Sequence, residues 1–366
     1  INDLERLVAE QPGNGWYHPE RPDMWRFGGL LPLDITNPGE RCHIVTLGEG
    51  HTPLLPFNDH RLARKAGCDI ALQWITEGRI ASPWICSSDA DAVLPDDYFH
   101  RLPEAGGRLS DDAPVAVTYP FQHLPGCDAG VDRGTALYEL RLHHYVLGLE
   151  YARSPYAYHT LGSCLGVDAL AYAQVRGFPR RSAAEDFYLH NKVAKLGPVL
   201  RLGGACIALR ARASTRVPFG TGPATMRIAG QAPETATLFY HPQAFAALRA
   251  LLDSIPACRD IETDTLAIHL RRRGLEQSVS STAARVMQDL GWSAALAHCR
   301  RHGRSDAQFL RQFHQWFDGF RTLKFIHGLR AAGWEDQSLA SLASVGPELW
   351  PTPANGAGDL LQSVQQ

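Results

Sequence analysis

The sequence predicts an α/β fold, in which a layered sheet is flanked by helices, followed by a helical C-terminal region. In the first part of the chain, short apolar segments alternate with segments whose apolar residues recur at helical spacing. An acidic motif, DAD, stands where one of these apolar segments ends. From about residue 231 helical patterns replace the alternation. We therefore expect a domain of residues 1–230 and a helical region of residues 231–366.

The first elements lead up to the acidic motif. Residues 1–60 are rich in Pro, Gly and His and contain one candidate strand, CHIVTL. Residues 59–78 are predicted to form a helix, because their apolar residues share one side and Gly78 suits a C-cap. The segment SPWICSSDAD predicts a buried strand, and PDDYFHRL (residues 95–102) predicts a helix with proline in its first turn.

The next elements continue the alternation. Residues 113–121 predict a strand, residues 136–152 an amphipathic helix, and residues 156–178 a strand and a short helix that ends at Gly177. Residues 183–196 predict a helix, residues 198–214 one or two strands, and TRVPFGTGPA a loop.

The C-terminal region contains three predicted helical segments, at residues 242–255, 263–274 and 305–333. The last segment carries an apolar stripe: Phe309, Phe313, Trp316, Phe320, Leu323 and Ile326. Its polar face mixes both signs of charge, which is not typical of a membrane-surface helix. We expect the stripe to cover the α/β domain or to join two copies in a homodimer.

Composition excludes several classes of protein. The chain has 36 Lys and Arg against 38 Asp and Glu residues, so its charge balance argues against a nucleic-acid partner. It lacks a run of about 18 apolar residues, and we expect no transmembrane segment. The eight cysteines are scattered without a C-x-x-C pair, which favours a reduced, cytoplasmic location over a zinc ribbon.

Two pairs of acids are the candidate catalytic groups. Asp89 and Asp91 follow a buried strand, where α/β sheets bind ligands, and both can face one Mg²⁺ or Mn²⁺ ion. Alternatively they form a turn and capping cluster. Glu185 and Asp186 lie in the first turn of a predicted helix, where one of them can act as a general base. Alternatively they only offset the helix dipole.

The order of these pieces resembles the family 2 glycosyltransferases of GT-A type. The D-x-D strand is followed by GSCLGVDALAYAQVRGF and then by EDFYLHNKVAKLG, and LARKAGCDIAL upstream is similar to the family's helix before that strand. The resemblance covers about residues 58–225. It implies a GT-A-like sheet and an inverting, metal-dependent transfer of a sugar from a nucleotide-sugar donor to an acceptor hydroxyl. Donor sugar, nucleotide base and acceptor are left open.

The resemblance implies roles for individual residues. Asp89 and Asp91 would bind the metal and the diphosphate, and Asp186 would be the base, with Glu185 supporting it. Further candidates for binding the nucleotide sugar or the acceptor are Arg64, Lys65, His159, Gly162 and Arg216. The alternatives are solvated helix charges for Arg64 and Lys65, a structural histidine for His159 and a plain surface loop for Arg216.

The sequence also departs from the family. The first 60 residues contain no strand like the family's VSVIIPxYNE, which we expect either to precede Ile1 or to be strongly altered. The QxxRW motif of processive synthases is absent, so we expect non-processive transfer. Two other functions remain open. A nucleotidyltransferase of related fold would carry a Gly-rich, basic loop on its first strand, and a degenerate GT-A domain would serve as a binding module.

Overall fold

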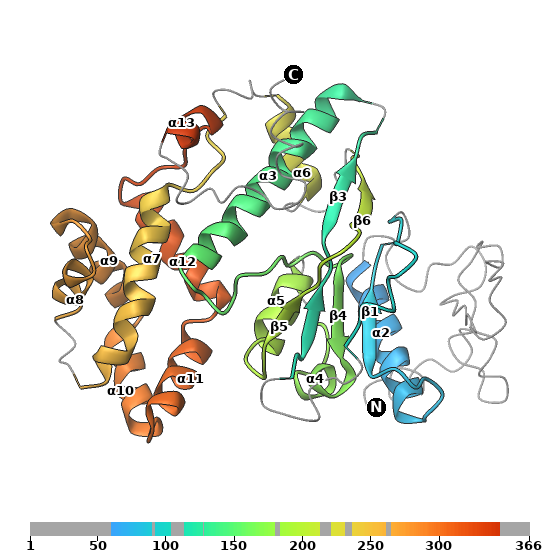
Figure 1. The fold of residues 1–366 in the computed structure, drawn as a ribbon, viewed down its shortest axis with the longest axis horizontal. Helices are drawn as coiled ribbons and strands as arrows, with labels where there is room; N and C mark the ends of the chain where they lie inside the picture. Colours follow the sequence, from blue (N-terminus) through green and yellow to red (C-terminus); the bar gives the residue numbers. More distant parts are fainter. Residues whose placement is uncertain are drawn as a thin grey trace.

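The protein is described by a computed structural model in which a small sheet and a group of C-terminal helices lie on opposite sides of one long helix (Figure 1). This arrangement confirms the mixed α/β class. The structure describes residues 60–89, 92–103, 113–126, 128–179, 184–212, 221–230, 236–260 and 265–344.

The main sheet of the described residues has four strands in the order β1-β4-β2-β5. Strand β4 is antiparallel to both β1 and β2, whereas β2 and β5 are parallel. A separate pair joins β3 and β6 in parallel. The strand bounds are β1 Trp84–Ser87, β2 Ala116–Thr118, β3 Phe121–Leu124, β4 Leu165–Asp168, β5 Val199–Arg201 and β6 Ile207–Arg210.

The register brings several strand ends to one end of the sheet. Ser87, the last residue of β1, and Thr118, the last residue of β2, both pair with Leu165, the first residue of β4. Thr118 also pairs with Arg201, the last residue of β5. The segments that follow β1 and precede β4 therefore meet at this end.

Three helices flank this sheet: α2 His60–Thr76, α4 Ala169–Gln174 and α5 Glu185–Val193. Helix α2 ends as predicted, because Gly78 takes the left-handed conformation (φ 72°) that glycine tolerates best. The core between the sheet and these helices is built from buried apolar side chains, among them Ile85, Ala116, Val167 and Leu189. Its burial supplies the dominant favourable free energy.

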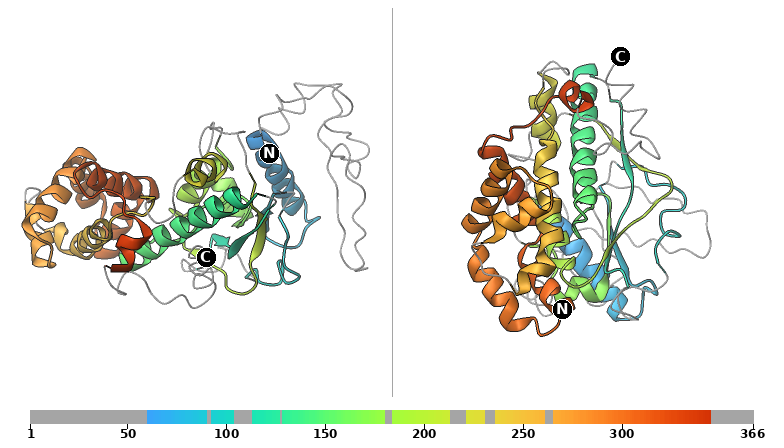
Figure 2. Two further views of the ribbon diagram at one scale, coloured as in Figure 1. Left: turned by 90° about the horizontal axis from the view of Figure 1, so that it is seen from above. Right: turned by 60° about the vertical axis from the view of Figure 1, so that its left-hand side comes forward.

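Helix α3, Ala129–Tyr151, runs between the sheet and the C-terminal helices (Figure 2). It begins earlier than the sequence predicts, because the Asp128 side chain accepts hydrogen bonds from the amides of Gly130 and Val131 (2.8 and 2.9 Å). Leu137 and Leu140 belong to a cluster with α6, Thr221–Ala229, whereas Leu149 belongs to the core of the helical region.

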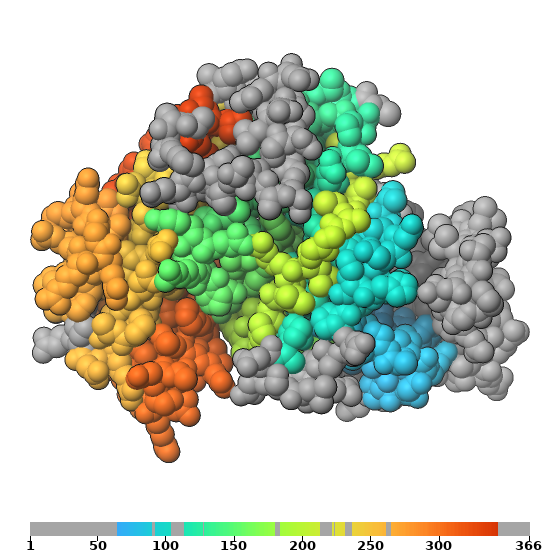
Figure 3. Space-filling model, viewed as in Figure 1, coloured from blue at the N-terminus to red at the C-terminus, as the bar shows by residue number. Residues whose placement is uncertain are grey.

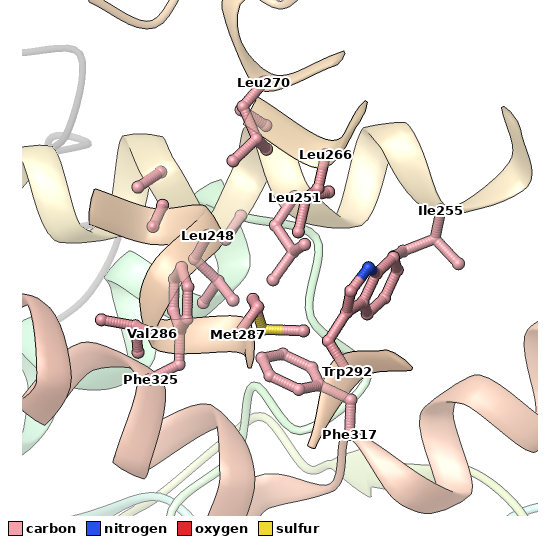
Figure 4. Packing of buried hydrophobic residues seen from close by; sticks show 14 of the residues in the cluster. Leu248, Leu251, Ile255, Leu266, Leu270, Val286, Met287, Trp292, Phe317 and Phe325 are labelled. Carbon is pink, nitrogen blue, oxygen red and sulfur yellow. The ribbon is translucent and has the colours of Figure 1, made fainter. Parts of the chain in front are cut away.

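The helical region has one main core among its described residues. Met287, Trp292, Phe317 and Phe325 gather between its helices (Figure 4) and are almost completely buried. In the space-filling view, these helices lie on one side of α3 and the sheet strands lie on its other side (Figure 3). The elements are α7 Pro242–Ser254, a 3-10 helix Ile255–Arg259, α8 Leu266–Arg272, α9 Gln277–Asp289, α10 Trp292–His302, α11 Asp306–Trp316, α12 Gly319–Ala331 and α13 Leu339–Ser344.

Some predicted elements are wrong. Residues 95–102 form turns instead of a helix, with hydrogen bonds such as that from the Tyr98 amide to the Pro95 carbonyl (3.0 Å). The predicted strand 113–121 is interrupted before β3, because Pro120 has no N–H to donate to a ladder. The predicted loop TRVPFGTGPA is helical from Thr221 onward.

The predicted helix of residues 305–333 is two helices. Helix α11 ends at Trp316, and Asp318 caps α12 by accepting a hydrogen bond from the Arg321 amide (3.1 Å). Phe309, Phe313 and Ile326 of the predicted stripe enter the chain's own helical core. Phe320 instead reaches the sheet domain, with its ring centroid 6.4 Å from that of Phe187 in α5. The homodimer stays a prediction.

Part of what the sequence predicts falls outside the described residues: the CHIVTL strand, Asp91 and Arg216. Within the described part of the chain, every helix is too short or too polar to cross a membrane.

Candidate active site

The guanidinium group of Arg64 connects four elements at the end of the sheet. Its Nη2 lies 2.8 Å from Oδ1 of Asp89, and its Nη1 donates to Oγ of Ser87 at 2.6 Å. Nη1 also donates to the carbonyl oxygen of Gly162, and Nε lies 3.8 Å from Oε1 of Glu185. A planar guanidinium with five donors suits this task better than a lysine ammonium does.

The fold explains why these groups meet. Ser87 ends β1 and Asp89 lies two residues beyond it, while Gly162 lies three residues before β4, at the same end of the sheet. Glycine at position 162 allows the close approach of Arg64. A Cβ atom placed there would lie 2.8 Å from Nη1 of Arg64, so any larger residue would displace the guanidinium.

Asp186 is fixed by two backbone amides. Its Oδ2 accepts a hydrogen bond from the Gly162 amide (2.9 Å), and its Oδ1 accepts one from the Phe187 amide (2.7 Å). Burial, together with the nearby charge of Glu185, raises the pKa of Asp186 to about 6. The Asp186 carboxylate is therefore ionised at neutral pH but remains basic enough to take up a proton.

The two neighbouring acids point to different partners. Glu185, whose side chain is only 8% exposed, lies beside Arg64, whereas Asp186 contacts the loop before β4. Ala184, directly before them, adopts a left-handed backbone conformation (φ 59°) that is unfavourable for a residue with a Cβ atom. Such strain clusters at functional sites, because the surrounding structure must hold it in place.

Asp89 has an exposed carboxylate that could take part in binding a divalent cation. Its side chain is 44% exposed, one oxygen is bound to Arg64, and carboxylate oxygens are the ligands that Mg²⁺ and Mn²⁺ prefer. In the described residues, no group of three or more His, Cys, Asp or Glu side chains is arranged to hold a metal ion. Asp89 could thus supply one ligand of such a site.

Lys65 and His159 lie away from the Arg64 contacts. Nζ of Lys65 pairs with Oδ2 of Asp69 at 2.7 Å, and Asp69 in turn accepts a hydrogen bond from the Tyr172 hydroxyl. The ring of His159 contacts the rings of Phe121 and His143, with centroids 5.0 and 4.8 Å away. Burial and the nearby His143 lower the pKa of His159 to about 3, so its imidazole is neutral.

Sequence reasoning missed a polar cluster next to His159. Glu139 in α3 is almost fully buried, and its Oε2 lies 2.6 Å from Nδ1 of His123. Burial opposes ionisation, but the neighbouring His123 and His143 outweigh it and lower the pKa of Glu139 to about 2. The signal in the sequence was a glutamate and a histidine, Glu139 and His143, four residues apart on an otherwise apolar helix face.

Two cavities lie beside this cluster and share Val146 and His159 as wall residues. The first, of about 290 Å³, is bounded by the turn between β2 and β3, by α3 and by residues 201–206. The second, of about 180 Å³, reaches Phe187 and Asn191 of α5. Phe187 directly follows Asp186 in the sequence, but Asp186 itself lines neither cavity.

Together, the fold and these contacts define an α/β protein with a cluster of acids around one guanidinium at the end of its sheet. Comparison with protein-family models, with curated proteins and with solved structures finds no match.

Proposed function

We propose that this chain is an inverting glycosyltransferase of GT-A type, which moves a sugar from a nucleotide-sugar donor to an acceptor hydroxyl. One observation carries the proposal: Asp186, a carboxyl group with its pKa raised to about 6, is held by two amides at the end of the sheet. General bases work best when their pKa lies near the working pH. Four residues of the motifs that resemble the family lie at this end of the sheet: Asp89, Gly162, Glu185 and Asp186.

In the proposed reaction, Asp186 is the base. The acceptor hydroxyl gives its proton to Asp186 while its oxygen forms the new bond to the anomeric carbon of the donor sugar. The bond from that carbon to the diphosphate oxygen breaks, and its electron pair leaves with the nucleoside diphosphate. Because the acceptor attacks the face opposite to the leaving group, the configuration at the anomeric carbon is inverted.

Arg64 acts as a positioning residue in this proposal. It ties the end of β1, the loop before β4 and the start of α5 together through Asp89, Gly162 and Glu185. Holding reacting groups in place before the substrate arrives lowers the entropic part of the activation barrier. The Gly162 amide also donates a hydrogen bond to Asp186, so the loop that Arg64 holds in turn holds the proposed base.

A divalent metal is part of the proposal. A Mg²⁺ or Mn²⁺ ion bound through Asp89, with Asp91 as second ligand by resemblance, would neutralise negative charge on the leaving diphosphate. The exposed carboxylate of Asp89 at the end of the sheet supports this role.

Calorimetry with a panel of UDP-, GDP- and dTDP-sugars tests the proposal. We expect one donor to bind in the presence of Mn²⁺, to lose affinity in a chelator, and to lose it again in Asp89→Asn. Asp96→Asn is the matched control, because Asp96 is an exposed acid on the turn beyond β1. Metal-independent binding of the donor would contradict the metal assignment.

Turnover separates the proposal from its alternatives. Release of nucleoside diphosphate from the bound donor is expected for a glycosyltransferase. Release of pyrophosphate from a nucleoside triphosphate and a sugar phosphate would instead indicate a nucleotidyltransferase. Donor binding without turnover under any condition would indicate a binding module.

A further inference from the structure

The cavity of about 290 Å³ is lined by residues of three kinds. Phe121 and Tyr119 provide aromatic surface, and Glu139, His143 and His159 provide polar groups. Gly203 contributes backbone without a side chain. Its volume lies near the lower end of the range of about 300–1,000 Å³ that is typical of small-molecule sites. A ligand the size of one sugar residue therefore matches it.

The polar wall has an unused hydrogen-bond acceptor. Glu139 is 1% exposed, and its Oε2 is bound by His123. The other oxygen, Oε1, has no hydrogen-bond partner among the described residues, and the nearest imidazole nitrogen, Nε2 of His143, is 3.8 Å away. An unsatisfied buried carboxylate oxygen is unfavourable, so a ligand that donates a hydrogen bond to this wall would relieve it.

The other wall groups can both donate and accept hydrogen bonds. His159 is neutral, and a neutral imidazole carries one donor and one acceptor nitrogen. The ring of His143 stacks on that of Phe121 with an interplanar angle of 9°, and both residues line the cavity. Aromatic side chains beside mixed donors and acceptors are complementary to a sugar ring, which has apolar faces and a rim of hydroxyl groups.

The cavity lies next to a second cavity, which is lined by Phe187, the neighbour of the proposed base in the sequence. His159 and Val146 separate it from the second cavity, which extends to Phe187 beside Asp186. An acceptor that spans this wall would have one part beside Phe187 and the other against Glu139 and His143.

We propose that the Glu139–His143–His159 cavity binds a sugar residue of the acceptor, at a distance from the reacting hydroxyl. This inference rests on the proposed glycosyl transfer, because it assigns the cavity to that reaction's acceptor. Hydroxyl groups fit the wall better than an ammonium group does, because His123 already pairs with the carboxylate of Glu139 and His159 is neutral.

Saturation-transfer NMR on the full chain tests this directly, with glucose, galactose, mannose and N-acetylglucosamine as probes and without nucleotide. We expect at least one of them to bind. Gly203→Trp should obstruct the cavity, since a Cβ atom at Gly203 meets nothing within 4 Å. We expect it to weaken binding by roughly tenfold or more, the factor that the loss of one good contact produces.

Two further variants sharpen the test. His143→Ala should weaken the same sugar, whereas His143→Gln should restore part of its binding. Gly230→Trp is the matched control, because Gly230 lies outside the cavity lining and has room for a Cβ atom. Circular dichroism checks that every variant is folded.

The proposal is overturned if the wild-type chain binds none of the four sugars, or binds one equally well in folded Gly203→Trp. It is also overturned if putrescine competes for the cavity and the sugars do not, which would assign it to a cation. Failure of the proposed function is a separate result, since nucleotide sugars would then fail to bind or turn over while sugar binding still depends on Gly203.

Discussion

The sheet region and the helical region bury different kinds of side chain. In the described part of residues 60–230, buried ionisable groups include Glu139, Asp168, Glu185 and His190. In the described part of residues 236–344, the buried acid is Asp318, which faces the sheet region. Ionisable groups are expensive to bury, so their concentration on one side indicates where function has been favoured over stability.

Backbone strain follows the same division. The non-glycine residues with positive φ in the described structure are Arg153, Arg176 and Ala184, all before the helical region. Within the described helical region, positive φ occurs at glycines alone, such as Gly274 and Gly291. The helical region therefore provides a stable support, while the sheet region holds energetically unfavourable groups in place. The predictions below test this division.

The largest effect is expected for Asp186→Asn. Loss of a general base typically lowers the rate by roughly 10²–10⁴-fold, while donor binding remains near normal. Steady-state turnover and calorimetry measure the two quantities. Glu185→Gln is the matched control and should be milder, because Glu185 faces Arg64. Near-full turnover by Asp186→Asn would instead indicate that this acid only offsets the helix dipole.

Phe325→Ala should have the opposite effect to Asp186→Asn: it should lower the stability of the protein and leave turnover nearly unchanged. Phe325 is fully buried in the helical core, and removal of such a ring lowers the free energy of unfolding by about 3–5 kcal/mol. Urea denaturation measures the loss, and turnover of the remaining folded protein should be nearly unchanged. A large fall in turnover below the unfolding transition would break the division between the two regions.

Arg64→Lys should lower turnover by roughly 10- to 100-fold, because an ammonium cannot keep the contacts to Ser87, Asp89 and Gly162 together. Lys65→Gln is the neighbouring control and should leave turnover unchanged, since Lys65 pairs only with Asp69 in the salt bridges of the described residues. Equal effects of the two substitutions would contradict a special role for Arg64.

Asp318→Ala tests the contact between the regions. Asp318 pairs with Lys195 (2.5 Å), accepts a hydrogen bond from Asn191 (3.1 Å) and caps α12. We expect a loss of about 1–2 kcal/mol in the free energy of unfolding, because a cap and a partly exposed ion pair are removed. Asp318→Asn keeps the cap and should lose less, and an unchanged midpoint of denaturation for Asp318→Ala would contradict this role.

The smallest effect concerns pH. The folded-state pKa of Asp186, about 6, lies above its usual value of 3.8, so Asp186 contributes stability at low pH that is lost as the pH rises through 6. Asp186→Asn lacks this titration. Relative to wild type, the variant should therefore gain about 1 kcal/mol between about pH 5.5 and about pH 8. Denaturation at both pH values measures the gain, and a constant difference would contradict the raised pKa.

Local patterns predicted most of the elements because their signals lie within a few residues. Gly78 and Gly177 end their helices with positive φ, and β1 stops before Asp89 as its apolar run does. The break between α11 and α12 was missed because apolar residues continue across it. The contacts of Asp318 with Asn191 and Lys195 could not be predicted, because these residues lie more than 120 positions away in the sequence.

The site was predictable in its acids but not in its connections. Asp89, Glu185 and Asp186 stand at element ends that the sequence marks. Arg64 could not be assigned its partners, because they come from three other elements and meet only in the folded sheet. The cluster around Glu139 was missed for the same reason, since His123 belongs to β3 and Glu139 to α3.

The position of β4 has a consequence for how the chain folds. Strands β1 and β2 do not pair with each other but both pair with β4, which is made later in the chain. During synthesis, β1 and β2 therefore lack their common partner strand until Leu165–Asp168 has been made and can insert between them. Loop closure over such separations slows folding and prolongs the exposure of apolar strands. The Asp89–Arg64–Gly162 cluster, which spans this insertion, can form only after that step is complete.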